Sequence, residues 1–237
     1  MKITSPFSFY GGKSKISHLY SKPKYDIIIE PFAGSAAYAF RHWEHEVVIN
    51  DLNSSVIEIW KFLLSPDAAD LVEKYVPEIV EAGQLISDMN LPNKGLELLL
   101  RSEANRGTQG TKYTVNQITS MAAICWNARL KKKLIKEVIP KVRHWKLIEG
   151  HYLDLFNQLA TWFIDPPYSN QAGSKYKINA VNFTELSIWC QNRLGQVIVC
   201  ENAGANWLPF DSLCERRGVK SRYQRSKAVE VVWEKEI

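Results

Sequence analysis

The chain has 237 residues, of which 46% are hydrophobic, 23% charged and 11% aromatic. This length suffices for one well-buried α/β domain with a small insertion and is too short for two full domains. No run of 18 apolar residues occurs, so a membrane-spanning helix is excluded, and the N-terminus lacks a secretory hydrophobic region. Four separated cysteines without a Cys-x-x-Cys pair (Cys125, Cys190, Cys200 and Cys214) indicate reduced thiols in a cytoplasmic protein rather than disulfides or a zinc site.

The net charge of +5 is unevenly distributed along the chain. Residues 47–100 carry a net charge of −6, residues 101–146 carry +9, and residues 216–227 hold six basic residues and no acid. Blocks of one sign favour a polyanionic partner, because each phosphate contact releases condensed counterions. A solvated helix face is the simpler explanation for Lys131, Lys132 and Lys133 taken alone.

Short apolar runs alternate with helical segments at the start of the chain. Residues 26–30 and 46–50 have the β-branched pattern of buried parallel strands, and residues 36–42 and 53–64 favour helices. A strand–helix–strand–helix order of this spacing predicts a right-handed crossover and a parallel sheet.

Residues from about 66 to 140 interrupt this alternation. Helical patterns at 68–75, 96–103 and 118–138 surround a polar, glycine-bearing loop at 105–113, which predicts an inserted, mostly helical subdomain with a functional loop. The later elements are predicted as strands at 145–149, 161–165 and 196–201, a helix at 183–193, and a hairpin from 212–216 and 229–234.

Two features near the first two strands are typical of a nucleotide site. Gly34 follows the first strand, where a missing Cβ lets a ligand approach the backbone closely, and Asp51 ends the second strand, where an acid can hold ribose hydroxyls. The chain has no Gly-x-Gly-x-x-Gly and no phosphate loop. Taken alone, Gly34 is equally consistent with an ordinary turn.

The tetrapeptide Asp165-Pro166-Pro167-Tyr168 follows a predicted strand. The prolines remove two N–H donors and stiffen the backbone, Asp165 adds an anionic acceptor, and Tyr168 adds an aromatic face. An exocyclic amine on a planar base needs two acceptors and a ring to stack on. A third segment, Gly11-Gly12-Lys13 after the aromatic residues Phe9 and Tyr10, could hold a small anionic group or be a simple turn.

These segments resemble the Dam-type DNA N6-adenine methyltransferases of the α class over nearly the whole chain. The motifs occur in the family's order: Gly11-Gly12-Lys13, Glu30-Pro31-Phe32-Ala33-Gly34, Asn50-Asp51 and Asp165-Pro166-Pro167-Tyr168. The resemblance implies an α/β fold, with a Rossmann-like S-adenosylmethionine-dependent methyltransferase sheet. Residues 1–64 and 145–237 would form the catalytic domain, and residues 65–144 an inserted target-recognition subdomain.

The resemblance also implies an activity, a methyl donor and a set of site residues. The expected reaction transfers a methyl group from S-adenosylmethionine to adenine N6 in double-stranded DNA after base flipping, leaving S-adenosylhomocysteine and using no metal. Asp165 and Pro166 would accept from N6, Tyr168 would stack on the base, and Pro167 would complete the catalytic segment. The implied cofactor-binding residues are Phe9, Tyr10, Gly11, Gly12, Lys13, Glu30, Pro31, Phe32, Ala33, Gly34, Ser35, Asp51, His151 and Tyr152.

Two positions depart from the family pattern. Ala36 stands where the family usually has a second glycine, and His151 stands where it often has an acid. DNA contacts are expected by residue type from Arg106, Thr108, Gln109, Lys112, Tyr113, Lys131, Lys132, Lys133, Arg222 and Arg225.

Several alternatives stay open at this point. Cytosine N4 presents a similar amine to the same acceptors, a degenerate fold could bind nucleic acid without turnover, and RNA could replace DNA. We expect a monomer, or a dimer on DNA, in the cytoplasm of a bacterium or a phage-infected host, in a restriction-modification context.

Overall fold

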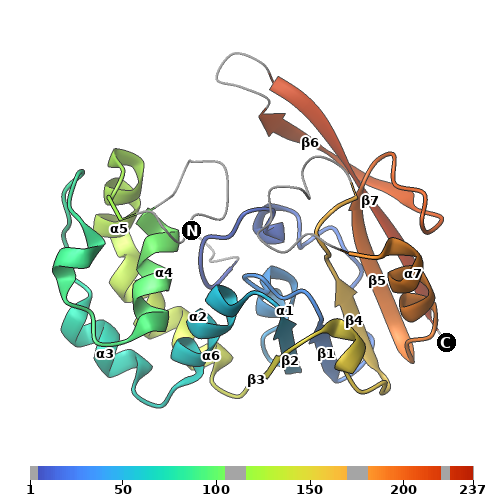
Figure 1. Ribbon diagram of the computed structural model, residues 1–237, viewed down its shortest axis with the longest axis horizontal. Coiled ribbons are helices and arrows are strands. Elements are labelled where there is room, and N and C mark those ends of the chain that lie inside the picture. Colours follow the sequence, from blue (N-terminus) through green and yellow to red (C-terminus); the bar gives the residue numbers. More distant parts are fainter. Residues whose placement is uncertain (1–4, 105–115, 170–180, 220–224, 237) are drawn as a thin grey trace.

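The computed structural model describes residues 5–104, 116–169, 181–219 and 225–236. Within these ranges, seven strands form one sheet in the order β3-β2-β1-β4-β5-β7-β6 (Figure 1). The strands are β1 (Ile27–Glu30), β2 (Glu46–Asp51), β3 (Lys146–Glu149), β4 (Ala160–Ile164), β5 (Gly195–Asn202), β6 (Asp211–Val219) and β7 (Arg225–Glu236).

The described helices cluster on both faces of the sheet and at one end of the molecule. They are α1 (Ala37–Arg41), α2 (Ser54–Leu64), α3 (Ala68–Tyr75), α4 (Lys94–Ala104), α5 (Ser120–Lys133), α6 (Ile139–Val142) and α7 (Phe183–Gln191), with short helices at Lys13–Lys15 (η1), Ile86–Met89 (η2), Leu134–Val138 (η3) and Tyr152–Asp154 (η4). None of the helices in the described ranges is both long enough and apolar enough to cross a membrane.

The direction of the strands determines at which end of the sheet a ligand can bind. Strands β1 to β5 are parallel, and β7 runs antiparallel between β5 and β6. The chain builds outward from β1 through β2 to β3 and then returns to the other side of β1 with β4. Ligands of open α/β sheets bind beyond the carboxyl ends of the strands at such a switch point. The predicted α/β, Rossmann-like methyltransferase fold is confirmed.

Two hydrophobic cores lie on opposite faces of the sheet. Alternating side chains go to opposite faces, so that in β4 Phe163 joins one core whereas Trp162 and Ile164 join the other. The first core contains α1, α2 and the helices between residues 68 and 142, and the second contains α7. The helices of the 68–142 segment therefore share a continuous core with the sheet.

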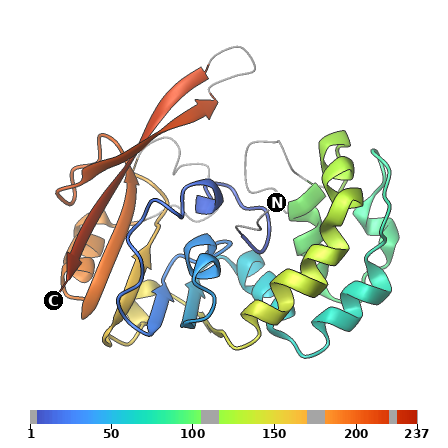
Figure 2. The same ribbon diagram turned by 180° about the vertical axis from the view of Figure 1, so that it is seen from behind.

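The predicted helix at 118–138 is interrupted near its end. Helix α5 begins at Ser120, and residues Leu134–Val138 form a widened π-helical turn before α6. Pro140 lacks an N–H, and its ring crowds the carbonyl four residues earlier, which explains why the regular helix cannot continue. Figures 1 and 2 show these helices at the end of the molecule opposite the β6–β7 hairpin.

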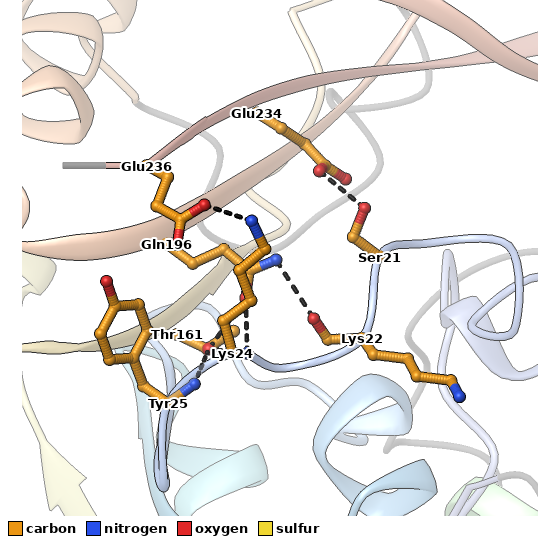
Figure 3. Close-up of polar contacts among 8 residues, drawn as sticks. All are labelled: Ser21, Lys22, Lys24, Tyr25, Thr161, Gln196, Glu234 and Glu236. Atoms are coloured by element: carbon orange, nitrogen blue, oxygen red, sulfur yellow. Dashed lines mark hydrogen bonds and ion pairs between the residues drawn. The ribbon is translucent and has the colours of Figure 1, made fainter.

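The segment Ser21–Tyr25, just before β1, is fastened across three strands (Figure 3). The backbone N–H of Lys24 donates to Thr161 on β4 and to Gln196 on β5, and Ser21 donates to Glu234 on β7 at 2.7 Å. Thr161 and Gln196 are buried. These bonds fix the path of the N-terminal chain, which carries residues 9–13 over the carboxyl edge of the sheet.

We predict that Gly95→Ala destabilises the fold. A Cβ at Gly95 would lie 2.1 Å from the carbonyl oxygen of Glu58 and 2.6 Å from Cβ of Phe62, so α4 and α2 would have to separate. Overpacking of this kind costs about 1–3 kcal/mol, whereas Gly→Ala in an open helix stabilises by about 0.5–1 kcal/mol. Denaturant unfolding measures the change, with exposed Lys94→Ala on the same helix as the control; an increase in the free energy of unfolding of Gly95→Ala would contradict the packing.

Candidate active site

One pocket lies at the carboxyl edge of β1, β2 and β4. All of the predicted cofactor-binding residues line it, together with Asp165 and Pro167 of the tetrapeptide. The predicted residues in its wall are Phe9, Tyr10, Gly11, Gly12, Lys13, Glu30, Pro31, Phe32, Ala33, Gly34, Ser35, Asp51, His151, Tyr152, Asp165 and Pro167. Phe9 and Pro167, which lie 158 positions apart in the sequence, thus meet at one cavity.

The glycine turn after β1 is packed tightly against the N-terminal segment. Gly34 has a φ of +48°, and a Cβ there would lie 2.7 Å from Cε1 of Phe9. The indole N–H of Trp60 donates to the carbonyl of Gly34 at 2.9 Å. Ala36 has a left-handed φ of 45°, a conformation that glycine adopts without steric cost. The turn therefore has left-handed backbone at two positions, and its glycine lets the Phe9 ring pack directly on the chain.

Asp51 ends β2 and faces the same turn. Its carboxylate accepts from the backbone N–H of Gly34 at 2.9 Å and from that of Asn53 at 2.8 Å. Burial raises the pKa of Asp51 to about 6, because removing water disfavours the charged form more than these two hydrogen bonds favour it. A carboxylate held in this way has lone pairs left for hydroxyl donors of a ligand.

A buried ion pair joins the N-terminal segment to the tetrapeptide. Nζ of Lys13 lies 2.5 Å from Oδ1 of Asp165 and 3.7 Å from Oε1 of Glu230. The side chain of Lys13 is 3% exposed and that of Asp165 is 20% exposed. The ammonium also lies 4.8 Å from the centre of the Tyr168 ring. Asp165 is therefore held at the pocket wall beside a cation.

The other tetrapeptide residues divide between the pocket and the interior. Pro167 lines the pocket, whereas buried Pro166 and half-buried Tyr168 are not among the lining residues. The hydroxyl of Tyr168 donates to Oε1 of Glu230 at 2.5 Å, so its polar end is turned into the protein. The N–H of Ser169, the next residue, donates to the buried carboxylate of Glu201 at 3.0 Å.

Glu30 contributes a second unusual carboxyl group. Its Oε1 accepts from the backbone N–H of Ala39 at 2.7 Å, inside α1. Burial raises the pKa of Glu30 to about 8, and nearby Asp165 adds to the rise, while Lys13 opposes it. The hydrogen bond from Ala39 to Glu30 joins the end of β1 to α1 across the glycine turn, and Glu30 lines the pocket there.

Three pocket residues of the segment around the start of α7 were absent from the sequence predictions: Val181, Asn182 and Glu185. Asn182 caps α7 by accepting from the N–H of Glu185, and the hydroxyl of Tyr152 lies 3.5 Å from Oε2 of Glu185. The Asn-x-x-Glu spacing is a capping signal that predicts where a helix starts. Nothing in that spacing predicts a pocket.

His151 and Tyr152 occupy the pocket wall that follows β3. His151 caps η4 by accepting from the N–H of Leu153, and its ring lies 4.4 Å from the ring of Tyr152. Tyr152 also contacts Phe32, with ring centres 5.2 Å apart. These rings, tilted relative to one another, form an aromatic side of the pocket.

Most of the predicted DNA contacts lie outside the described residues: Arg106, Thr108, Gln109, Lys112, Tyr113 and Arg222. Arg225 pairs with Val219 in the β6–β7 hairpin, and its side chain lies outside the described part.

Among the three consecutive lysines, only Lys132 is fully exposed. Lys131 binds the carbonyl of Glu73 at 2.6 Å. Lys133 is buried, and its Nζ lies 3.7 Å from the buried carboxylate of Glu103. The prediction that Lys133 contacts a phosphate is therefore corrected, because helix α5 directs this side chain into the interior.

Metal binding and disulfide bonds are the remaining chemistries to consider in the described ranges. In those ranges no group of three or more His, Cys, Asp or Glu side chains could hold a metal ion. The four cysteines are free thiols.

Comparisons with known proteins agree with the motifs. Residues 9–91 match the model of the D12 class N6 adenine-specific DNA methyltransferase family, which confirms the predicted resemblance. No curated protein matches the chain. A solved structure of a candidate methylase from Haemophilus influenzae is similar over 88% of this chain and 78% of that chain, with 12% identity and a TM-score of 0.34. That likeness is too weak to carry an argument, and the family match covers the first part of the chain, up to residue 91.

We predict that Gly34→Ala destabilises the protein more than Gly204→Ala does. Both glycines have positive φ, so each substitution carries a backbone strain of about 1–2 kcal/mol. A Cβ at Gly204 would meet nothing within 4 Å, whereas one at Gly34 would displace the Phe9 ring. Denaturant unfolding of both variants measures the difference. An equal loss in the two variants would show that Phe9 does not pack on the turn.

Proposed function

We propose that this chain transfers a methyl group from S-adenosylmethionine to adenine N6 in double-stranded DNA after base flipping. The observation that supports this most strongly is that Asp165 and the Gly34 turn line the same pocket. The two motifs are 131 residues apart in the sequence and come from different strands. A reaction between a nucleoside-like donor and a base amine requires both in one cavity.

The residues around the glycine turn suit an adenosyl group. A Cβ at Gly12 would meet the carbonyl oxygen of Phe9 and the hydroxyl of Ser35, and one at Gly34 would meet the Phe9 ring, so the two glycines let the N-terminal segment pack directly on the turn in this wall. Asp51 has acceptor lone pairs for ribose hydroxyls, and Phe32 and Tyr152 have apolar faces for a purine. When bound, S-adenosylmethionine supplies a methyl group on a positively charged sulfur.

Asp165 provides the acceptor that a target amine needs. The lone pair of adenine N6 is delocalised into the ring, and hydrogen bonds from the amino group to fixed acceptors help to localise it. Lys13 binds Oδ1 of Asp165, and a carboxylate has further lone pairs for an N–H donor. Positive charge develops on N6 during the attack, and a preorganised anion stabilises that charge.

Tyr168 is the stacking surface in this proposal. A flipped base has lost its neighbours in the duplex at a cost of about a few kcal/mol, and an aromatic face recovers part of that loss. We assign the polar contacts to the Asp165 carboxylate, which lines the pocket, and to the carbonyl of the adjoining Pro166, whose side chain is buried.

We propose residues 65–144 as the target-recognition subdomain and residues 1–64 with 145–237 as the catalytic domain. The basic segment 101–146 belongs to the first part, and exposed Lys132 is suited to a phosphate contact. We assign the reaction to the cytoplasm of a bacterium or of a phage-infected cell, where duplex DNA and the methyl donor are both present.

Transfer of label from methyl-labelled S-adenosylmethionine to unmethylated plasmid DNA tests the reaction, followed by nucleoside analysis. We expect N6-methyladenine, with loss of at least about 100-fold in kcat for Asp165→Ala and Asp165→Asn. Asp211→Asn, an exposed carboxylate on β6, is the control. Label only in N4-methylcytosine would move the reaction to cytosine, and full activity of both Asp165 variants would contradict its role.

We also predict that binding of S-adenosylhomocysteine weakens as the pH falls through about 6. Only ionised Asp51 accepts from two ribose hydroxyls, and its pKa is about 6, so affinity falls by up to tenfold per pH unit below that value. Calorimetry between pH 7.5 and 5.5 measures the effect. Glu30, with a pKa of about 8, stays largely protonated across this interval.

Asp51→Asn is the control for this pH dependence. The variant retains His151, which also lines the pocket, so any remaining pH dependence would come from groups other than Asp51. A dissociation constant of the parent protein that does not change between pH 7.5 and 5.5 would contradict the role of Asp51.

A further inference from the structure

Glu230 is a buried carboxylate that belongs to none of the recognised motifs. It lies on β7, is 0% exposed, and pairs through the backbone with Asn202 on β5 and Cys214 on β6. Alternation along β7 puts Glu230 on the same face as Val232, which packs on the core containing η1. Burying an ionised carboxylate in such a place costs several kcal/mol of folding free energy, unless hydrogen-bond donors and a cation compensate for the lost water.

Three groups from separate segments converge on one oxygen of Glu230. Oε1 accepts from the hydroxyl of Tyr20 at 2.8 Å and from that of Tyr168 at 2.5 Å. Nζ of Lys13 lies 3.7 Å from the same atom. Tyr20 precedes β1, Tyr168 follows β4, and Lys13 is in η1, so the carboxylate joins three parts of the site to β7.

The contact with Tyr168 constrains the ring at its far end. A tyrosine side chain has two rotatable bonds before its hydroxyl, so holding both the backbone and the hydroxyl oxygen leaves the ring little freedom. The backbone beside it is stiffened by Pro166 and Pro167. Lys13 lies 4.8 Å from the centre of the ring, which adds a favourable cation–π contact.

Glu230 also acts on Asp165 through the shared ammonium. Lys13 is almost fully buried and has carboxylate oxygens on two sides, at 2.5 Å from Asp165 and at 3.7 Å from Glu230. Attraction toward both anions fixes the ammonium between them more closely than one partner would. The position of the Asp165 carboxylate therefore depends in part on the charge of Glu230.

We propose that Glu230 is a positioning residue, which sets the stacking face of Tyr168 and the acceptor of Asp165 before a base enters. This inference rests on the proposed methyl transfer. Glu230 itself faces the interior and is not among the residues lining the pocket. Its loss should therefore lower kcat while leaving the binding of the methyl donor nearly unchanged.

Steady-state methylation of unmethylated plasmid DNA by Glu230→Gln tests this proposal. The amide keeps the size of the side chain and can still accept a hydrogen bond, but it removes the charge that Lys13 faces. We expect kcat to fall at least tenfold, with the KM for S-adenosylmethionine and the affinity for S-adenosylhomocysteine within about twofold of the parent. Glu234→Gln is the matched control, because Glu234 lies on the same strand and contacts Ser21 away from the pocket (Figure 3).

Tyr168→Phe tests the same contact without altering a buried charge. It keeps the ring and removes the hydroxyl that Glu230 accepts from, so we expect a fall in kcat of at least fivefold, with the KM for S-adenosylmethionine within about twofold of the parent. If both residues act through one contact, the double variant loses less than the product of the two single effects. If Glu230→Gln does not fold, Tyr168→Phe decides between the outcomes by itself.

Two results would overturn the inference while leaving the proposed reaction intact. One is parental kcat in Tyr168→Phe, with parental kcat in Glu230→Gln where that variant folds. The other is a double variant whose loss equals the product of the single losses, since the residues would then act separately. A parent protein that transfers no methyl group to DNA would overturn the proposed function together with this inference.

Discussion

The site depends on one buried cation. Lys13 is 3% exposed, and its ammonium lies between Asp165 from the end of β4 and Glu230 from β7. Two carboxylates near one another repel, and an ammonium between them offsets that repulsion. The same contact attaches the N-terminal segment to the sheet, so that Phe9 covers the glycine turn and the pocket acquires its wall. Removal of this one charge would disturb the acceptor, the stacking ring and the donor side of the pocket together.

The fold explains how these groups come together. The parallel strands β1, β2 and β4 end at one edge, where they present Glu30, Asp51 and Asp165. The N-terminal chain is fastened across β4, β5 and β7 before it enters β1, and Ser8 bonds to Glu103 at the end of α4 through its N–H at 3.0 Å. The segment with Phe9 and Lys13 thus contacts the sheet on one side and the inserted helices on the other. The helices around α4 and the pocket are therefore connected physically through this segment.

Most of the fold follows from local patterns in the sequence. The β-branched runs before Pro31 and Asp51 predicted parallel strands, and the helices after them were found within one or two residues of the expected bounds. The end of the 118–138 helix was not predicted, because the widened turn before Pro140 depends on how the chain relieves a steric conflict. In the site, the resemblance to the family pointed to residues that line the pocket. It could not predict Glu230 or Glu185, because each is brought to the site by long-range packing and resembles any other acid in the sequence. Lys133 was misjudged for the same reason, since its burial depends on Glu103 in another helix.

The Gly34 turn and Asp165 share a cavity, and we propose that this cavity holds a nucleoside beside a base amine. A crystal structure of the protein with S-adenosylhomocysteine tests this most directly. We predict ribose hydroxyls on Asp51, the adenine beside Tyr152, and the sulfur end directed toward Asp165, with Lys13 still paired to that carboxylate. An S-adenosylhomocysteine molecule bound elsewhere, or one whose sulfur is directed away from Asp165, would contradict the account.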